Sequence, residues 1–173
     1  PLRVCPAPRS LNCPTRKEVS PIDFCHIPVS IIQRSKGRSA VAAAAYRSGT
    51  KLTNEWDGVT HDYTRKTGVV HSEIMLPAHA PPEFADRSTL WNSVEQIEKA
   101  RDSQLAREVE AALPRELTRE QQLALVRAYV KDNFVGKGMC ADFAIHDKGT
   151  GNPHVHIMLT IRPLKDDGSW GAK

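Results

Sequence analysis

The chain has 173 residues, of which 40% are apolar and 25% are charged, with a formal net charge of +4 and a pI near 9.0. This length supports one domain with a full hydrophobic core and is too short for two well-packed domains. No apolar run approaches the roughly 20 residues that cross a bilayer, and the opening segment lacks the apolar core of a signal peptide. The composition therefore excludes a membrane-spanning protein and predicts a cytoplasmic one with no membrane partner.

The cysteines are scattered and lack the C-x-x-C spacing of a redox or zinc motif. A core of this size needs no covalent cross-links, so all of them are predicted to be free thiols: Cys5, Cys13, Cys25 and Cys140.

Basic residues crowd one segment of the first half of the chain, namely Arg34, Lys36, Arg38, Arg47 and Lys51. Such a cluster is either a phosphate-binding surface or an ordinary solvated surface. The net charge is compatible with a polyanionic partner but does not require one.

The first half of the chain predicts a flexible leader, a strand and a short helix. Residues 1–22 hold five prolines and show no regular periodicity. Residues 23–33 alternate as in a strand, and the side predicted to face the core carries Cys25, Ile27, Val29 and Ile31. A helix with the sequence AVAAAAYRS follows, capped by Ser39 and ended by Gly49. Two further strands are predicted over residues 59–65 and 68–76.

The second half alternates helices and strands. Residues 87–101 have the apolar spacing of an amphipathic helix, and residues 118–135 form another behind a capping box at 118–121. Between them, the alternation of residues 104–114 favours a strand over an extension of the first helix. Two final strands, over 139–146 and 153–163, are joined by the turn DKGTGN. This order predicts an α+β protein with a mainly antiparallel sheet and helices packed on one face.

Three histidines converge in the final hairpin. His154 and His156 are two residues apart, so their side chains leave one face of the strand about 6.5 Å apart. A symmetric turn over residues 147–153 places His146 almost opposite His154. The alternation of the preceding strand puts His146 on the same face, because its predicted core residues are Ala141, Phe143 and Ile145.

A metal site and a set of satisfied surface histidines are both compatible with this pattern, and the agreement of the two alternations favours metal. A structural zinc site needs a fourth ligand, but Cys140 lies roughly 20 Å away along an extended strand. A three-histidine site keeps open coordination positions, which is the catalytic arrangement.

An open cation needs a nucleophile, and Tyr46 on the alanine-rich helix is the candidate. Basic residues flank it, and nearby cations stabilise a phenolate. The alternative is that Tyr46 only packs in the core. Of the other tyrosines, Tyr129 lies on a helix predicted to be buried and Tyr63 on a predicted strand.

The motifs GRSAVAAAAYRSG (37–49) and NPHVHIMLTIRPL (152–164) resemble the MobA/MobL relaxases, plasmid mobilisation enzymes of the HUH (His, hydrophobic, His) endonuclease superfamily. The resemblance runs from about Phe24 to the end of the chain. It includes DYTRKTGVVHSEIMLP, LWNSVEQIEKARDSQLAREVEAALP and ELTREQQLALVRAYV. It implies a relaxase domain over residues 23–173, truncated at its C-terminal end, with a five-stranded antiparallel sheet.

The resemblance implies an enzyme that nicks one DNA strand at an origin of transfer. Tyr46 would attack the scissile phosphate, leaving a 5′-phosphotyrosine and a free 3′-hydroxyl. His146, His154 and His156 would hold one divalent cation; imidazole favours Mn, Ni or Zn over Mg, so the ion stays open among these four. The implied partners are single-stranded or hairpin DNA, bound through the basic segment, and accessory mobilisation and coupling proteins.

Glu108 is a further candidate, since an acidic residue near such a site assists proton transfer or orients the metal. The alternative for Glu108 is a solvated or arginine-paired carboxylate. His26 is interpreted as a structural histidine. Alternative functions are a rolling-circle replication initiator, which generally carries its tyrosine after the histidines, and a non-catalytic single-stranded nucleic-acid binding domain. A histidine-triad hydrolase is disfavoured because Met158 stands where its third histidine belongs.

Overall fold

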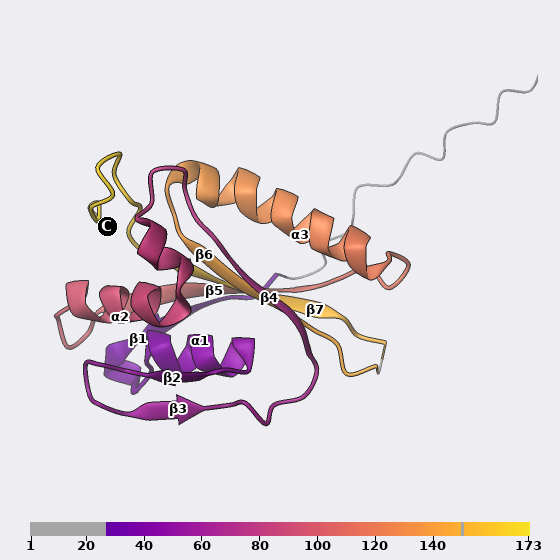
Figure 1. Cartoon of the computed structure of the whole chain (residues 1–173), viewed down its shortest axis with the longest axis horizontal. Coiled ribbons are helices and arrows are strands. Elements are labelled where there is room, and N and C mark those ends of the chain that lie inside the picture. The colour runs from indigo at the N-terminus through magenta and orange to yellow at the C-terminus, as the bar shows by residue number, and fades with distance from the viewer. Residues whose placement is uncertain (1–26, 150) are drawn as a thin grey trace, which may run out of the picture.

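The computed structural model describes residues 27–149 and 151–173, which form a five-stranded sheet, a two-stranded ribbon and three α-helices (Figure 1). The main sheet has the order β1-β5-β7-β6-β4, and every neighbouring pair is antiparallel. Its strands are β1 (Val29–Gln33), β4 (Val69–Met75), β5 (Gln104–Ala112), β6 (Ala141–His146) and β7 (His154–Thr160). The ribbon pairs β2 (Lys51–Thr53) with β3 (Thr60–Asp62). The predicted α+β class with a five-stranded antiparallel sheet is confirmed.

The α-helices are α1 (Ala40–Ser48), α2 (Arg87–Ile97) and α3 (Arg119–Asn133). Short 3-10 helices are η1 (Arg34–Lys36), η2 (Pro82–Ala85) and η3 (Val135–Lys137). Across the described ranges, every helix falls short of the length and hydropathy that crossing a bilayer requires.

Several predictions lie outside the described residues. These are the leader over 1–22, the start of the first strand with His26, and Cys5, Cys13 and Cys25. The fourth cysteine, Cys140, is buried as a free thiol, and burial raises its pKa to about 12.

The helices cover both faces of the sheet, so the prediction of helices on one face is wrong. Figure 1 shows α3 on one side of the sheet and α1 with α2 on the other. Each side has its own apolar core. Val126 and Val130 of α3 belong to the same cluster as Ile157, whereas Trp91 of α2 belongs to the same cluster as Met158. Met158 places an apolar side chain on the same face of β7 as the histidines. That part of the face must therefore be covered by helices, as the α3 face is.

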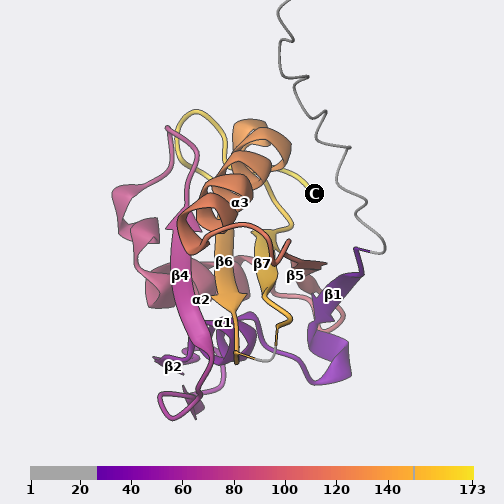
Figure 2. The same ribbon diagram turned by 90° about the vertical axis from the view of Figure 1, so that its right-hand side faces the viewer.

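The inward face of β1 is the opposite of the predicted one. Ile32 is 1% exposed beneath α1 and α2, whereas Val29 is 63% exposed on the α3 side. The strand lies at the edge of the sheet, and Figure 2 shows α3 lying over the region of β6 and β4, away from β1. Alternation alone does not reveal which of two apolar-looking faces receives a covering helix.

Local signals in the sequence predicted the helix ends correctly. The Ser39 hydroxyl accepts a hydrogen bond from the Ala42 N–H at the start of α1, and Gly49 ends the helix with φ 67°. Thr118 and Gln121 form the predicted capping box of α3. The alternation over 104–114 is strand β5, as predicted. Strand β2 was not predicted, and β3 pairs with it outside the main sheet.

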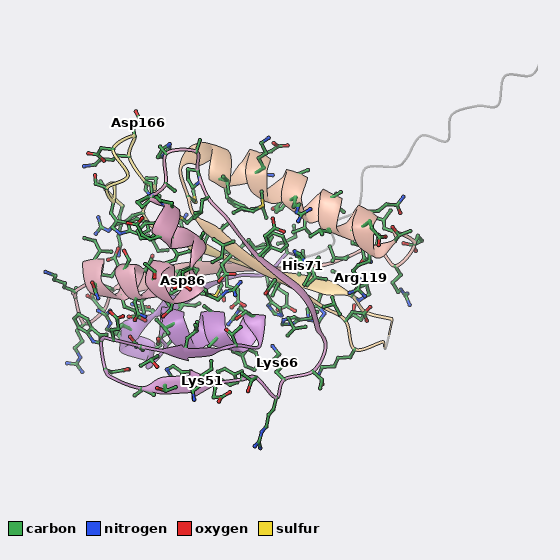
Figure 3. The ribbon with its side chains drawn as sticks, in the orientation of Figure 1. Lys51, Lys66, His71, Asp86, Arg119 and Asp166 are labelled. Atoms are coloured by element: carbon green, nitrogen blue, oxygen red, sulfur yellow. The ribbon has the colours of Figure 1, made fainter. Side chains whose placement is uncertain are left out.

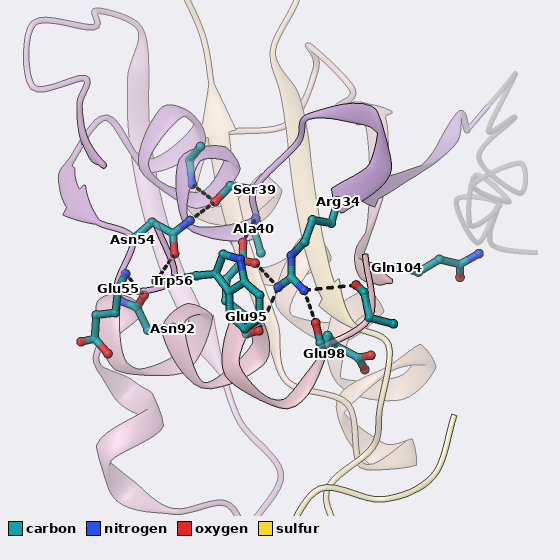
Figure 4. A network of polar contacts seen from close by, with 12 residues as sticks. Arg34, Ser39, Ala40, Asn54, Glu55, Trp56, Asn92, Glu95, Glu98 and Gln104 are labelled. Carbon is teal, nitrogen blue, oxygen red and sulfur yellow. Dashed lines mark hydrogen bonds and ion pairs between the residues drawn. The ribbon is translucent and has the colours of Figure 1, made fainter. Parts of the chain in front are cut away.

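A buried ion pair holds the start of α1 against α2 (Figure 4). Glu95 of α2 is 1% exposed, and one carboxylate oxygen accepts the Ala40 N–H at 2.7 Å. Its other oxygen accepts the Arg34 guanidinium at 2.7 Å, and that guanidinium lies 4.1 Å from the centre of the Trp56 ring. A carboxylate at a helix N-terminus also interacts favourably with the helix dipole. This network fixes where α1 begins and therefore where its last turn ends.

We predict that Glu95→Ala lowers the free energy of unfolding by about 3–5 kcal/mol, because it leaves the Arg34 charge without its buried partner. Urea unfolding followed by circular dichroism measures this. The matched control is Glu55→Ala. Within residues 27–149 and 151–173, its exposed side chain accepts a hydrogen bond only from Gln96, so its loss should change stability by less than about 0.5 kcal/mol. Equal, small effects of both variants would contradict an anchoring role for Glu95.

Candidate active site

Three imidazoles meet where β6 and β7 pair at the end of the sheet. His146 is the direct cross-strand partner of His154, as the hairpin symmetry predicted. The ring centroid of His146 lies 5.4 Å from that of His154 and 4.8 Å from that of His156. The centroids of His154 and His156 are 5.2 Å apart. One ring nitrogen from each residue lies within 4.8 Å of the others. The structure thus brings the three predicted ligands together on one face.

The outer contacts of these rings favour a metal site. Nδ1 of His156 lies 3.1 Å from a Glu108 carboxylate oxygen, and Nδ1 of His154 lies 3.0 Å from the Asn152 carbonyl oxygen. With Nδ1 protonated, Nε2 of both rings presents a lone pair. For His146, Nε2 lies 2.7 Å from the Arg47 carbonyl oxygen, which leaves Nδ1 as its lone-pair nitrogen. Metal-binding histidines typically donate their second nitrogen to a carboxylate or carbonyl in this way.

The spacing also fits one cation. Two nitrogens bound tetrahedrally at about 2.1 Å are roughly 3.4 Å apart. The nitrogens of the three histidines lie within 4.8 Å of one another, so small side-chain rotations would bring them to bonding distance from one ion. The donor set of three imidazoles can hold a divalent cation and leave a coordination position for substrate.

The pKa values of His146 and Glu108 are both shifted by their surroundings. Burial lowers the pKa of His146 to about 4, and the nearby charge of Lys66 adds to this, so His146 is neutral at pH 7. Burial would raise the pKa of Glu108, but hydrogen bonds from His156 and Arg47 outweigh burial and lower it to about 2. Glu108 is consequently a permanent carboxylate that is shared between His156 and the Arg47 guanidinium.

Tyr46 lies in the last turn of α1, next in the chain to a residue that touches the histidines. The Arg47 carbonyl contacts His146, and the Arg47 guanidinium contacts Glu108. The Tyr46 side chain is 48% exposed, and its ring meets the Tyr63 ring edge-to-face at 5.2 Å. This exposure argues against the alternative that Tyr46 only fills the core.

An open groove leads from Tyr46 along α1 towards the edge strand β1. Its lining includes Tyr46, Tyr63, Arg38, Arg47, Ser30 and Glu108. Cations and aromatic rings in one groove, next to a candidate nucleophile, suit a nucleic-acid strand.

The five basic residues predicted to contact DNA are not equivalent. Arg38 and Arg47 line the groove, Lys36 is exposed on η1, and the Lys51 side chain is 61% exposed. Arg34 differs, because its guanidinium donates to Glu95 and to the carbonyls of Glu95, Glu98 and Ala100. Its donors are engaged inside the protein, so we assign Arg34 to the anchor of α1.

Lys66 is a residue of this site that the sequence analysis did not single out. Its Nζ donates to the Tyr46 carbonyl oxygen at 2.7 Å and lies 3.7 Å from the centre of the Tyr46 ring. Figure 3 shows Lys66 beside the C-terminal end of α1. The only signal was the basic pair at residues 65 and 66, and its position depends on how the segment between β3 and β4 folds back.

Comparisons with known proteins identify the family of the chain. The MobA/MobL family model matches residues 38–173. The chain is 50% identical over 160 residues to the conjugal transfer protein TraA of Agrobacterium fabrum, covering 87% of this chain and 14% of TraA. It is 40% identical to the mobilization protein MobL of Acidithiobacillus ferridurans, covering 86% of this chain and 45% of MobL. The chain therefore spans a small part of the TraA relatives and under half of MobL.

A solved structure described as the "Molecular Basis of Vancomycin Resistance Transfer in Staphylococcus aureus" superimposes with a TM-score of 0.81 and 31% identity, covering 86% of this chain and 75% of that one. The fold, the family match and the relatives lead to one conclusion: the chain belongs to the MobA/MobL family of relaxases.

Proposed function

We propose that this domain nicks one strand of DNA at an origin of transfer by transesterification onto Tyr46. The observation that carries the proposal is the convergence of His146, His154 and His156 beside the turn of α1 that presents Tyr46. Over the described residues the cluster offers three imidazole donors and no fourth protein ligand, which suits a cation that must also bind substrate, and an exposed phenol would supply the nucleophile.

In the proposed reaction, the Tyr46 phenol oxygen attacks the phosphorus of the scissile phosphodiester. The new bond joins Tyr46 to the 5′-phosphate, and the bond to the 3′-oxygen breaks. The phenol proton passes to solvent, and the released 3′-oxygen takes up a proton. Since one phosphate ester replaces another, the 3′-hydroxyl can reverse the step and rejoin the strand.

A divalent cation held by the three histidines would supply a Lewis acid that polarises a phosphoryl oxygen and offsets its developing charge. Imidazole donors suit Mn²⁺, Ni²⁺ or Zn²⁺ better than Mg²⁺. The triad would orient the phosphate against Tyr46, and phosphoryl transfer depends chiefly on such positioning and charge neutralisation.

Glu108 acts in this proposal as a positioning residue. A carboxylate with a pKa of about 2 is a poor acceptor for the Tyr46 proton at neutral pH. Its contacts instead hold Nδ1 of His156 in its protonated form and tie Arg47 to β5. The family implies single-stranded or hairpin origin DNA as the partner, bound along the groove by Arg38 and Arg47, with Lys36 and Lys51 adding phosphate contacts.

We predict that Tyr46→Phe abolishes a covalent protein-DNA adduct. Single-stranded oligonucleotides tiling the DNA around the gene for this chain are incubated with the protein and Mn²⁺, and adducts are separated on denaturing gels. Tyr63→Phe is the matched control, because its ring contacts the Tyr46 ring at 5.2 Å and it should retain the adduct. An undiminished adduct in Tyr46→Phe would reassign the nucleophile.

We predict one divalent cation per chain. At a Mn²⁺ concentration about 100 times its Kd, the ion should stabilise the protein by about 2.7 kcal/mol against denaturant. His156→Ala should remove this stabilisation. His71→Ala should keep it, because His71 lies against Phe143 on the α3 side and pairs with Glu73. Metal stabilisation that survives in His156→Ala would place the ion elsewhere.

We predict that Glu108→Gln weakens metal affinity about 10- to 100-fold, because it removes the charge that orients His156. Isothermal titration calorimetry with Mn²⁺ measures the affinity. Glu110→Gln is the matched control: that carboxylate lies on the same face, but its side chain is 50% exposed and 3.8 Å from Nδ1 of His156. Affinity changes of the same size in both variants would contradict a specific role for Glu108.

A further inference from the structure

The segment between β3 and β4 is held rigidly against the candidate active site. The Tyr63 N–H donates to the Thr50 carbonyl at 3.1 Å, and the Lys66 N–H donates to the Tyr63 carbonyl at 2.9 Å. At the far end of the segment, the Gly68 carbonyl accepts the Asp147 N–H at 2.8 Å. The segment is therefore fixed to the end of α1 on one side and to the β6–β7 hairpin on the other.

This rigid segment points a lysine at the nucleophile. The Lys66 Nζ lies over the Tyr46 ring and also donates to the Tyr46 carbonyl. An ammonium at 3.7 Å from a ring centre makes a cation–π contact, which restricts the ring orientation. One hydrogen bond uses one of the three ammonium donors, so further donors stay available for a ligand.

The charged groups next to Lys66 in the described part of the chain are cations. Its charged neighbours are Arg47 and Lys148, and its charge also acts on His146. Over residues 27–149 and 151–173, no carboxylate lies within ion-pair distance of Lys66. Burial, followed by the like charges of Arg47 and Lys148, lowers the pKa of Lys66 to about 8. A half-buried cation among other cations is electrostatically uncompensated, and a bound anion would compensate it.

We propose that Lys66 is a phosphate-binding residue that contacts the scissile phosphodiester from the side of Tyr46, opposite the cation held by the histidines. This inference rests on the proposed function and adds a second positive group to it. The histidine site and Lys66 come from different elements, and both approach the end of α1 that carries Tyr46. The phosphate of the substrate would be the anionic partner of the Lys66 ammonium, in the place of a carboxylate. It also keeps the Tyr46 ring oriented for attack.

A chemical double-mutant cycle separates phosphate contact from general support of the fold. The protein carries Tyr46→Phe so that no adduct forms, and EDTA removes any contribution of metal. The probe is an oligonucleotide that forms an adduct with the parent protein. A second version carries a methylphosphonate at the scissile position, which removes that single negative charge. Fluorescence anisotropy gives the Kd of each pair.

With Lys66 present, the methylphosphonate should weaken binding about ten-fold, the scale of one charge-assisted hydrogen bond. In the Lys66→Met background, the same modification should raise the Kd by less than about two-fold. Lys66→Arg, which keeps the charge, should restore most of the penalty. Lys51→Met is the matched control, because Lys51 is an exposed lysine that is proposed to contact a phosphate other than the scissile one. It should weaken binding of both oligonucleotides by the same factor and leave the full methylphosphonate penalty in place.

The outcomes are distinguishable. An equal methylphosphonate penalty with and without Lys66 overturns the inference but leaves the nicking function intact, because the probe is by design an oligonucleotide with which the parent protein forms an adduct. If Lys66→Met in that case also weakens binding of both oligonucleotides by the same factor, the role of Lys66 is purely structural. Failure of the parent to form any adduct overturns the proposed function and this inference together. Thermal unfolding of each variant confirms that the protein compared is folded.

Discussion

The register between β6 and β7 is the constraint on which the site depends. His146 is paired directly with His154, and the two-residue spacing of a strand then brings His156 to the same face. A slip of one residue between these strands would turn His146 to the α3 side, where Ile145 now packs in the core. The apolar residues that alternate with the histidines resist that slip, since it would expose them. The stability of the sheet and the geometry of the triad are therefore specified by the same residues.

The second requirement is that α1 delivers its last turn to this triad. The Glu95 carboxylate fixes the start of α1 through the Ala40 N–H and Arg34, and the Arg47 carbonyl and guanidinium fix its end against His146 and Glu108. Small alanine side chains let the helix lie close to its neighbours, and Ala40, Ala44 and Ala45 are fully buried. Tyr46 lies on the side of the same helix that remains exposed. In the proposed reaction, an anchored helix with one outward phenol would present a preorganised nucleophile, because little conformational freedom is lost when substrate binds.

Features determined by local patterns were predictable from the sequence. The ends of α1 follow from Ser39 and Gly49, and the approach of the three histidines follows from strand alternation and the length of one turn. Features determined by long-range packing were not. Ile32 rather than Ile31 faces the core because of where the helices lie, and both faces of the sheet are covered because Met158 adds apolar surface next to the histidines. Arg34 stood in the basic segment, yet its partner Glu95 lies 61 residues away, so its structural role was hidden. Lys66 reaches Tyr46 only through the fold of the segment before β4.

We propose that three imidazoles from two paired strands hold one cation within reach of the phenol of α1. Anomalous diffraction from crystals grown with Mn²⁺ tests it most directly. We expect a single strong peak bonded to nitrogens of His146, His154 and His156 at roughly 2.0–2.3 Å, with the Tyr46 hydroxyl facing the open coordination side of the ion. A peak bound by other residues, or a triad whose rings turn apart while the ion is present, would contradict it.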